Sequence, residues 1–187
     1  MLLLLLLLLV VGTSAAVAHD GRQSDPATCV AGTNDQGTND GADENGSDDR
    51  SATISSDDNE VDGTDDANEI EGDQNDDHIS GHDGNDDECG NEGDDQLEGN
   101  QGDDTLDGGA GDDTIDGGAG DDNEFGRSGR DTLRGGRGHD HIFAGPGGDL
   151  IRVRDGRRDV VHCGSGTDKV IADAVDKVSK DCETVDD

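Results

Sequence analysis

The sequence contains neither tryptophan nor tyrosine and only two phenylalanines, so aromatic residues make up 1% of its 187 residues. Apolar residues of all kinds account for 27%. A globular core of large side chains is therefore hard to build from this chain. Low hydrophobicity combined with high net charge is typical of disordered proteins, so a folded state needs a further source of stability.

Basic residues are scarce as well: 13 Lys and Arg stand against 48 Asp and Glu, which gives a formal charge of −35. Residues 19–126 hold 36 of the acidic residues and two basic ones, Arg22 and Arg50. A nucleic-acid partner is excluded, because binding to phosphates requires a basic face. A salt-rich habitat would explain part of the acidity, and bound cations would explain it too.

Long hydrophobic runs are absent except at the N-terminus, where residues 1–18 read MLLLLLLLLVVGTSAAVA. Ala16-Val17-Ala18 fits the small-x-small cleavage pattern of a secretory signal, so we expect a secreted mature chain that begins near His19. No transmembrane anchor remains if the signal is cleaved. An uncleaved anchor is the alternative, although the run is short for a membrane span.

Motifs of catalysis are also missing: the sequence has no H-E-x-x-H helix and no G-x-S-x-G elbow. Paired acids such as Asp112-Asp113 would suit a general acid and base, but they recur every nine residues, which indicates ligands. His139 and His141 flank Asp140 and are interpreted as turn and strand residues of a repeat. The sequence therefore predicts that the protein is not an enzyme.

A nine-residue repeat is what the sequence does have. Nine rows cover residues 72–152, and GGAGDDTID at 108–116 is a regular example. Position four is Gly in eight rows, and position eight is Ile or Leu in seven, with Glu88 and Glu124 as the exceptions. Position six is Asp in every row: Asp77, Asp86, Asp95, Asp104, Asp113, Asp122, Asp131, Asp140 and Asp149. Such a fixed period indicates a repeat architecture.

Beyond these rows the nine-residue period continues, but fewer of its fixed residues are present. Asn59 and Asn68 take position six upstream, and one inserted residue near Val153 shifts the frame before Asp159 and Asp168 resume it.

Each row predicts a turn followed by a short strand. Gly, Asn and Asp favour the turn, because glycine reaches backbone angles that other residues avoid. Three residues such as Thr114-Ile115-Asp116 would form a strand with one inward apolar side chain. Two rows then make a coil of 18 residues, in which two strands face each other across a thin core of Ile and Leu.

The stacked carboxylates predict bound metal ions. Aspartates in successive coils would lie about 4.8 Å apart and repel one another without counter-ions. Ligands that are all oxygen atoms, with no recurring His or Cys, suit Ca²⁺ better than zinc, copper or Mg²⁺. We therefore expect several Ca²⁺ ions, held by the Asp at position six and by backbone carbonyls that the glycines allow to approach.

Rows 108–116 and 135–143 match the pattern G-G-x-G-x-D-x-U-x at every fixed position. Over residues 54–170 the chain resembles the haemolysin-type (RTX) calcium-binding nonapeptide repeat family. The resemblance implies an all-β fold, a parallel β-roll (β-solenoid), with each ion between turns one coil apart. The resemblance implies that one ion lies between the turns of Asp86 and Asp104, one between those of Asp95 and Asp113, and likewise for each later pair up to Asp131 and Asp149. The carbonyls that it implies as further ligands are those of Gly109, Gly111, Gly118 and Gly120.

Four cysteines in an exported chain suggest two disulfides. Cys163 and Cys182 are 19 residues apart, one coil plus one residue, so they would lie on neighbouring rungs within disulfide reach. The sequence predicts a Cys163–Cys182 disulfide and, by elimination, a Cys29–Cys89 disulfide. Four free thiols are the alternative.

The predicted organisation is a signal peptide (1–18), an acidic leader or cap (19–53), the calcium-binding roll (54–152), and degenerate repeats with a small disulfide-linked C-terminal cap (153–187). The leading hypothesis is a secreted protein in which Ca²⁺ drives folding of the roll. The alternative is a cell-surface structural or adhesion module stiffened by Ca²⁺, with cell-envelope or extracellular-matrix components as partners. An enzyme fragment is the least favoured hypothesis.

Overall fold

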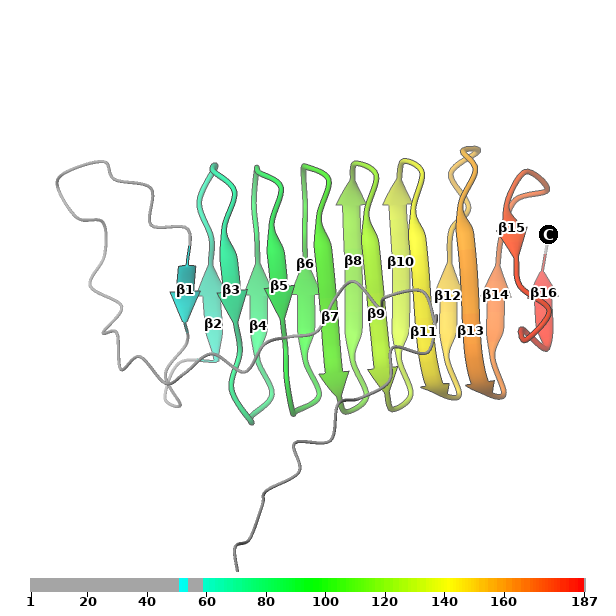
Figure 1. Ribbon diagram of the computed structural model, residues 1–187, viewed down its shortest axis with the longest axis horizontal. Helices are drawn as coiled ribbons and strands as arrows, with labels where there is room; N and C mark the ends of the chain where they lie inside the picture. Colours follow the sequence, from blue (N-terminus) through cyan, green and yellow to red (C-terminus); the bar gives the residue numbers. More distant parts are fainter. Residues whose placement is uncertain (1–50, 54–58, 187) are drawn as a thin grey trace, which may run out of the picture.

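The computed structural model describes residues 51–53 and 59–186, which form two parallel β-sheets of eight strands each. The strands follow one another along the long axis in chain order and alternate between the two sheets (Figure 1). The first sheet contains β1 (Ser51–Thr53), β3 (Glu69–Glu71), β5 (Asp87–Cys89), β7 (Thr105–Ala110), β9 (Asn123–Ser128), β11 (His141–Gly147), β13 (Val160–Gly166) and β15 (Lys177–Val178). The second contains β2 (Glu60–Asp62), β4 (His78–Ser80), β6 (Gln96–Glu98), β8 (Thr114–Ala119), β10 (Thr132–Arg137), β12 (Leu150–Arg152), β14 (Lys169–Ile171) and β16 (Thr184–Asp186).

The strand register confirms the predicted β-roll. Leu133 pairs with Ile115, and Leu106 pairs with Glu124, so equivalent residues lie 18 positions apart on neighbouring coils. The offset is still 18 between β10 and β12 but becomes 19 between β11 and β13. The extra residue therefore lies between β12 and β13, where the shift of the repeat frame near Val153 predicts it.

The core is a column of apolar side chains between the sheets, one from each row except those of Glu88 and Glu124. Its members at position eight are buried: Val61, Ile70, Ile79, Leu97, Leu106, Ile115, Leu133, Ile142, Ile151, Val161 and Val170. Small residues such as Ala144 and Ala172 complete the cluster near the C-terminal end. Because each row contributes so little apolar area, the coils are stable only as a stack.

The strands of the central rows are longer than the sequence predicts. Rows are expected to form three-residue strands, but β7 to β10 each contain six residues and run on through positions one and two of the next row, a glycine pair in β7, β8 and β10 and Gly126-Arg127 in β9. In this region the turn backbone bonds to the next coil: the amide of Gly111 donates to the carbonyl of Ser128 at 2.9 Å. Backbone groups that cannot reach water must find such partners.

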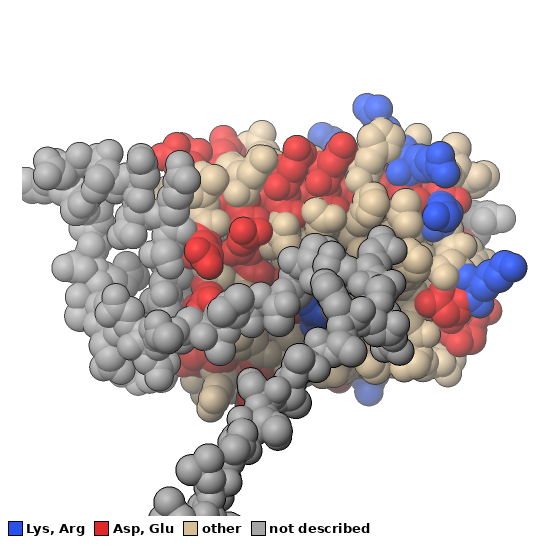
Figure 2. All heavy atoms as spheres, viewed as in Figure 1, with Lys and Arg blue, Asp and Glu red and all other residues tan. Residues whose placement is uncertain are grey.

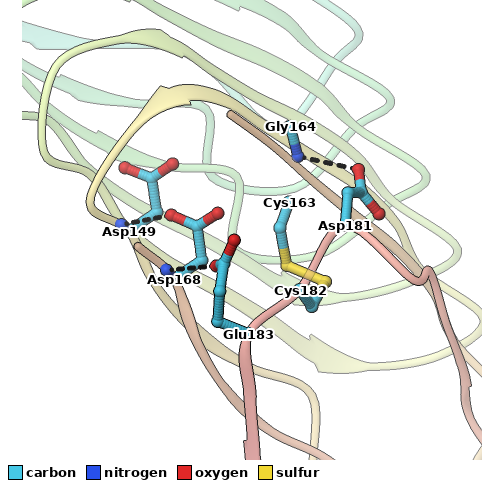
Figure 3. The surroundings of a disulfide bond; sticks show 7 residues. All are labelled: Asp149, Cys163, Gly164, Asp168, Asp181, Cys182 and Glu183. Carbon is cyan, nitrogen blue, oxygen red and sulfur yellow. Dashed lines mark hydrogen bonds between the residues drawn. A yellow bond between two sulfur atoms is a disulfide. The ribbon is translucent and has the colours of Figure 1, made fainter. Parts of the chain in front are cut away.

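The last coil is closed by the predicted Cys163–Cys182 disulfide, whose Cα atoms are 5.2 Å apart (Figure 3). Glu183 lies beside it and accepts a hydrogen bond from the amide of Asp168 at 2.8 Å. On the other side of the roll, Asp176 accepts one from the amide of Asp159 at 3.0 Å. The C-terminal cap thus supplies a carboxylate to the last Asp of each side.

Charge is distributed along the roll as the sequence predicts. On the face drawn in Figure 2, most Lys and Arg lie toward the end that carries the C-terminal strands, whereas Asp and Glu extend along the rest of the face. No helix among the described residues is long and apolar enough to cross a membrane.

Some predictions fall outside the described residues: the signal peptide, Arg22, Arg50 and Cys29. Cys89 is itself disulfide-bonded, and its predicted partner Cys29 lies in the part of the chain that is not described.

Removal of the C-terminal disulfide should destabilise the last coil. A Cys163→Ser, Cys182→Ser double variant should lose about 3 kcal/mol, because the bond closes a loop of roughly 20 residues. Urea unfolding in saturating Ca²⁺ measures the loss. An unchanged midpoint would show that the cap is stable without the bond.

The glycines at position four test how closely the coils pack. A Cβ added at Gly111, where φ is +150°, would lie well within 3.0 Å of the carbonyl oxygen of Gly93. Gly111→Ala should therefore cost at least about 2 kcal/mol, because the coils must separate locally. Gly148→Ala is the control, since a Cβ there would meet only the Thr167 carbonyl oxygen, at 3.6 Å, and it should change stability by less than about 0.5 kcal/mol. Equal losses would contradict the packing argument.

Candidate calcium-binding turns

The nine aspartates of position six lie in the turns between the sheets, and all are buried. They form two columns, one along each side of the roll, because successive rows alternate between the sheets. Asp159 and Asp168, which follow the inserted residue, continue the two columns and are equally buried.

Hydrogen bonds link each aspartate to the next coil. The amide of Asp86 donates to Oδ1 of Asp104 at 2.9 Å, and the amide of Asp104 donates in turn to Oδ1 of Asp122 at 2.9 Å. The same bond joins Asp95 to Asp113 on the other side. The structure thus brings together the aspartates that the resemblance pairs, one coil apart.

The second carboxylate oxygen of these side chains lacks a partner. Oδ2 is buried and without a hydrogen bond in ten of the described residues: Asp86, Asp95, Asp104, Asp113, Asp122, Asp131, Asp140, Asp149, Asp159 and Asp168. Asp77 differs, because its Oδ2 accepts a bond from the amide of Asp73 at 2.9 Å. A buried anionic oxygen without a partner is costly and calls for a counter-charge.

Seven of these ten oxygens face the glycine at position one of their own row: those of Asp86, Asp95, Asp104, Asp113, Asp122, Asp131 and Asp140. In the row of Asp149, position one is Ala144. A Cβ added at Gly99 would lie 2.5 Å from Oδ2 of Asp104 and 2.7 Å from the carbonyl oxygen of Gly117, one coil away. The missing side chain of glycine therefore leaves a small space lined by a carboxylate oxygen and a carbonyl oxygen.

The four predicted glycines all have positive φ: Gly109, Gly111, Gly118 and Gly120. The carbonyls of Gly111, Gly118 and Gly120 each point at the glycine one coil further on, which leaves no room for a side chain there. At position two the same left-handed conformation is held by four other residues: His82, Asn91, Asn100 and Arg127.

Three residue stretches, 54–87, 90–124 and 125–159, match the family model of the RTX calcium-binding nonapeptide repeat, and together they make up more than half of the chain. The chain belongs to this family. No match to a curated protein was found.

The donor set of the RTX repeats in this chain fits a hard cation. Among the described residues, no three His, Cys, Asp or Glu side chains are grouped closely enough to hold a metal by themselves. Backbone carbonyls lie close to the unpartnered Oδ2 atoms, as that of Gly117 does to Asp104 beside Gly99. Carboxylate and carbonyl oxygens in a glycine-rich turn are the ligands that Ca²⁺ takes.

Burial perturbs the acidity of the columns. Loss of solvation raises the pKa of Asp104, Asp113 and Asp140 to about 6. The same cause raises the pKa of Asp95 and Asp122 to about 7, and that of Asp131 and Asp159 also to about 7. Neighbouring carboxylates add to these increases, while the amide hydrogen bonds oppose them.

Sequence reasoning missed two features of the turns. Asp159 and Asp168 were seen to resume the frame but were not predicted as ligands, although their Oδ2 atoms are unpartnered like the others. The repeat pattern treats Glu88 and Glu124 only as interruptions of the apolar position, yet both side chains are buried.

Without metal, the roll should be more stable at pH 5 than at pH 7. The folded-state pKa values exceed the ordinary value of 3.8, so the folded chain binds more protons in this window, and stability falls as pH rises from about 4 to about 7. Far-UV circular dichroism of metal-depleted protein at several pH values checks this, because the β signal should be low at pH 7 and rise on acidification.

An Asp104→Asn, Asp122→Asn double variant serves as the control, because two of the raised groups are then absent and the slope should be shallower. A metal-free roll that gains no stability on acidification would contradict the electrostatic account.

Proposed function

We propose that the protein is a secreted Ca²⁺-binding protein in which several ions bind between successive coils and drive folding of the β-roll. The proposed ligands are the position-six aspartates with an unpartnered Oδ2, together with turn carbonyls such as those of Gly109, Gly111, Gly118 and Gly120. A binding role rather than a catalytic one is favoured, because the same carboxylate geometry recurs in row after row.

One observation carries this proposal: ten buried Oδ2 atoms have no hydrogen-bond partner among the described residues. In each of these carboxylates Oδ1 accepts a backbone amide, and in seven of them Oδ2 is directed at the space beside a glycine. Bound Ca²⁺ would neutralise these carboxylates. An ion that binds only the folded state stabilises it by mass action, so several weak sites add up to a large effect.

The disulfides support export. Cys163–Cys182 is formed, and Cys89 is disulfide-bonded as well. Such bonds persist in oxidising surroundings, which agrees with a secretory signal in residues 1–18. Extracellular fluids are also richer in Ca²⁺ than the cytoplasm, so a chain of this kind would fold after export.

Replacement of a column aspartate should weaken Ca²⁺ binding. Asp104→Asn retains an oxygen that can accept the amide of Asp86 but removes the charge, so the affinity of the adjoining sites should fall by about tenfold or more. Isothermal titration calorimetry with CaCl₂ measures the change.

Asp103→Asn is the matched control. Asp103 is exposed, and its Oδ1 accepts the amide of Asp121, a contact that Asn85 makes naturally with the amide of Asp103. The two variants lose the same charge from neighbouring positions. If both weaken binding equally, general electrostatics rather than the column is responsible.

A further inference from the structure

Two glutamates occupy positions of the core that are otherwise apolar. In the first sheet, Glu88 pairs with Ile70 and Leu106 on the neighbouring coils. Glu124 pairs with Leu106 and Ile142. The inner face of this sheet therefore alternates between aliphatic and acidic side chains over five successive coils.

Both glutamates are completely enclosed, with 2% of Glu88 and none of Glu124 exposed. Neither oxygen of either carboxylate accepts a hydrogen bond of normal geometry from the described residues, although the backbone of Gly81 lies close to Glu88 and that of Gly117 close to Glu124. The other side chains in the core column at position eight are Val, Ile or Leu, so packing alone gives no reason for an acid. A buried charge persists in proteins when it is paired or coordinates a metal.

The two carboxylates point at the glycine spaces of the turns. A Cβ added at Gly117 would lie 2.6 Å from Oδ2 of Asp122, 2.8 Å from the carbonyl oxygen of Gly135 and 2.9 Å from Oε1 of Glu124. Two carboxylates and one carbonyl from two coils thus surround one small space.

The space beside Gly81 also receives two carboxylates. There a Cβ would lie 2.7 Å from Oε1 of Glu88 and even closer to Oδ2 of Asp86. Row 99–107 lies between these two rows in the first sheet and has Leu106 at position eight. The space beside its Gly99 receives a single carboxylate, from Asp104.

We propose that Glu88 and Glu124 are cation ligands, each adding a second carboxylate to the binding turn of its own row, 81–89 or 117–125. This inference rests on the proposed function and deepens it, because it makes the sites along the roll unequal. The two turns with a glutamate carry one more negative ligand than the turn of row 99–107, which lies between them on the same side of the roll. Affinity for Ca²⁺ rises with the number of charged ligands, so these two sites fill first.

The alternative is that each glutamate is protonated and shares its proton with the neighbouring aspartate. The two arrangements respond differently to removal of the acid. If the glutamates are ligands, their loss weakens ion binding. If they are neutral core residues, an aliphatic replacement leaves ion binding unchanged and simply improves packing.

The test compares wild type with a Glu88→Leu, Glu124→Leu double variant, since Leu occupies position eight in other rows. Ca²⁺ binding is followed by calorimetry, and the number of ions per chain by equilibrium dialysis. We expect the tightest class of about two sites to weaken by at least about tenfold, while the remaining sites keep their affinity. Unchanged affinities in the variant would overturn the inference.

Glu88→Gln, Glu124→Gln keeps the shape of both side chains and should weaken the same sites, which covers the case in which the leucines alter the fold. Glu69→Gln, Glu92→Gln is the charge-matched control, because it also removes two negative charges but from exposed side chains, and it should leave all affinities unchanged. If wild type itself binds no Ca²⁺, the proposed function fails; if wild type binds and the glutamine variant binds equally well, only the glutamate inference fails.

Discussion

The bond between an aspartate and the amide of the equivalent residue one coil earlier is the contact on which this structure depends. It fixes the register of the coils, because Asp86, Asp104 and Asp122 each occupy the same place in successive turns. It also brings a negative charge into the interior, where Oδ2 is left without a partner. Each aspartate thus stabilises the stack through Oδ1, which accepts the amide, and destabilises it through the buried Oδ2, until a bound cation compensates the charge.

The remaining features follow from that conflict. The apolar core is one side chain wide and offers little to offset stacked charges, as the absence of Trp and Tyr already indicates. Glycine is required where a carbonyl of one coil touches the backbone of the next, as Gly93 touches Gly111. The C-terminal cap ends both columns with its own carboxylates, Asp176 and Glu183, and a disulfide holds it in place.

Much of this arrangement could be predicted, because a fixed nine-residue period places equivalent residues above one another. The 18-residue coil, the core of position eight and the Cys163–Cys182 disulfide all follow from it. The roles of Asp176 and Glu183 could not be predicted, because the last strands pair at offsets of 17 and 15 residues, outside the frame. The orientation of Glu88 and Glu124 could not be predicted either, because the repeat pattern shows only that an acid replaces an apolar residue and not which turn its carboxylate faces.

The central claim is that cations compensate the buried carboxylates and thereby permit folding. Far-UV circular dichroism of the chain from residue 19 onward, recorded in chelator and then during titration with CaCl₂ and separately with MgCl₂, tests it most directly. The account predicts little β signal in chelator at neutral pH and a cooperative gain with Ca²⁺ but not with Mg²⁺, reversed by excess chelator. A chain that is already fully β-structured in chelator at neutral pH would contradict it.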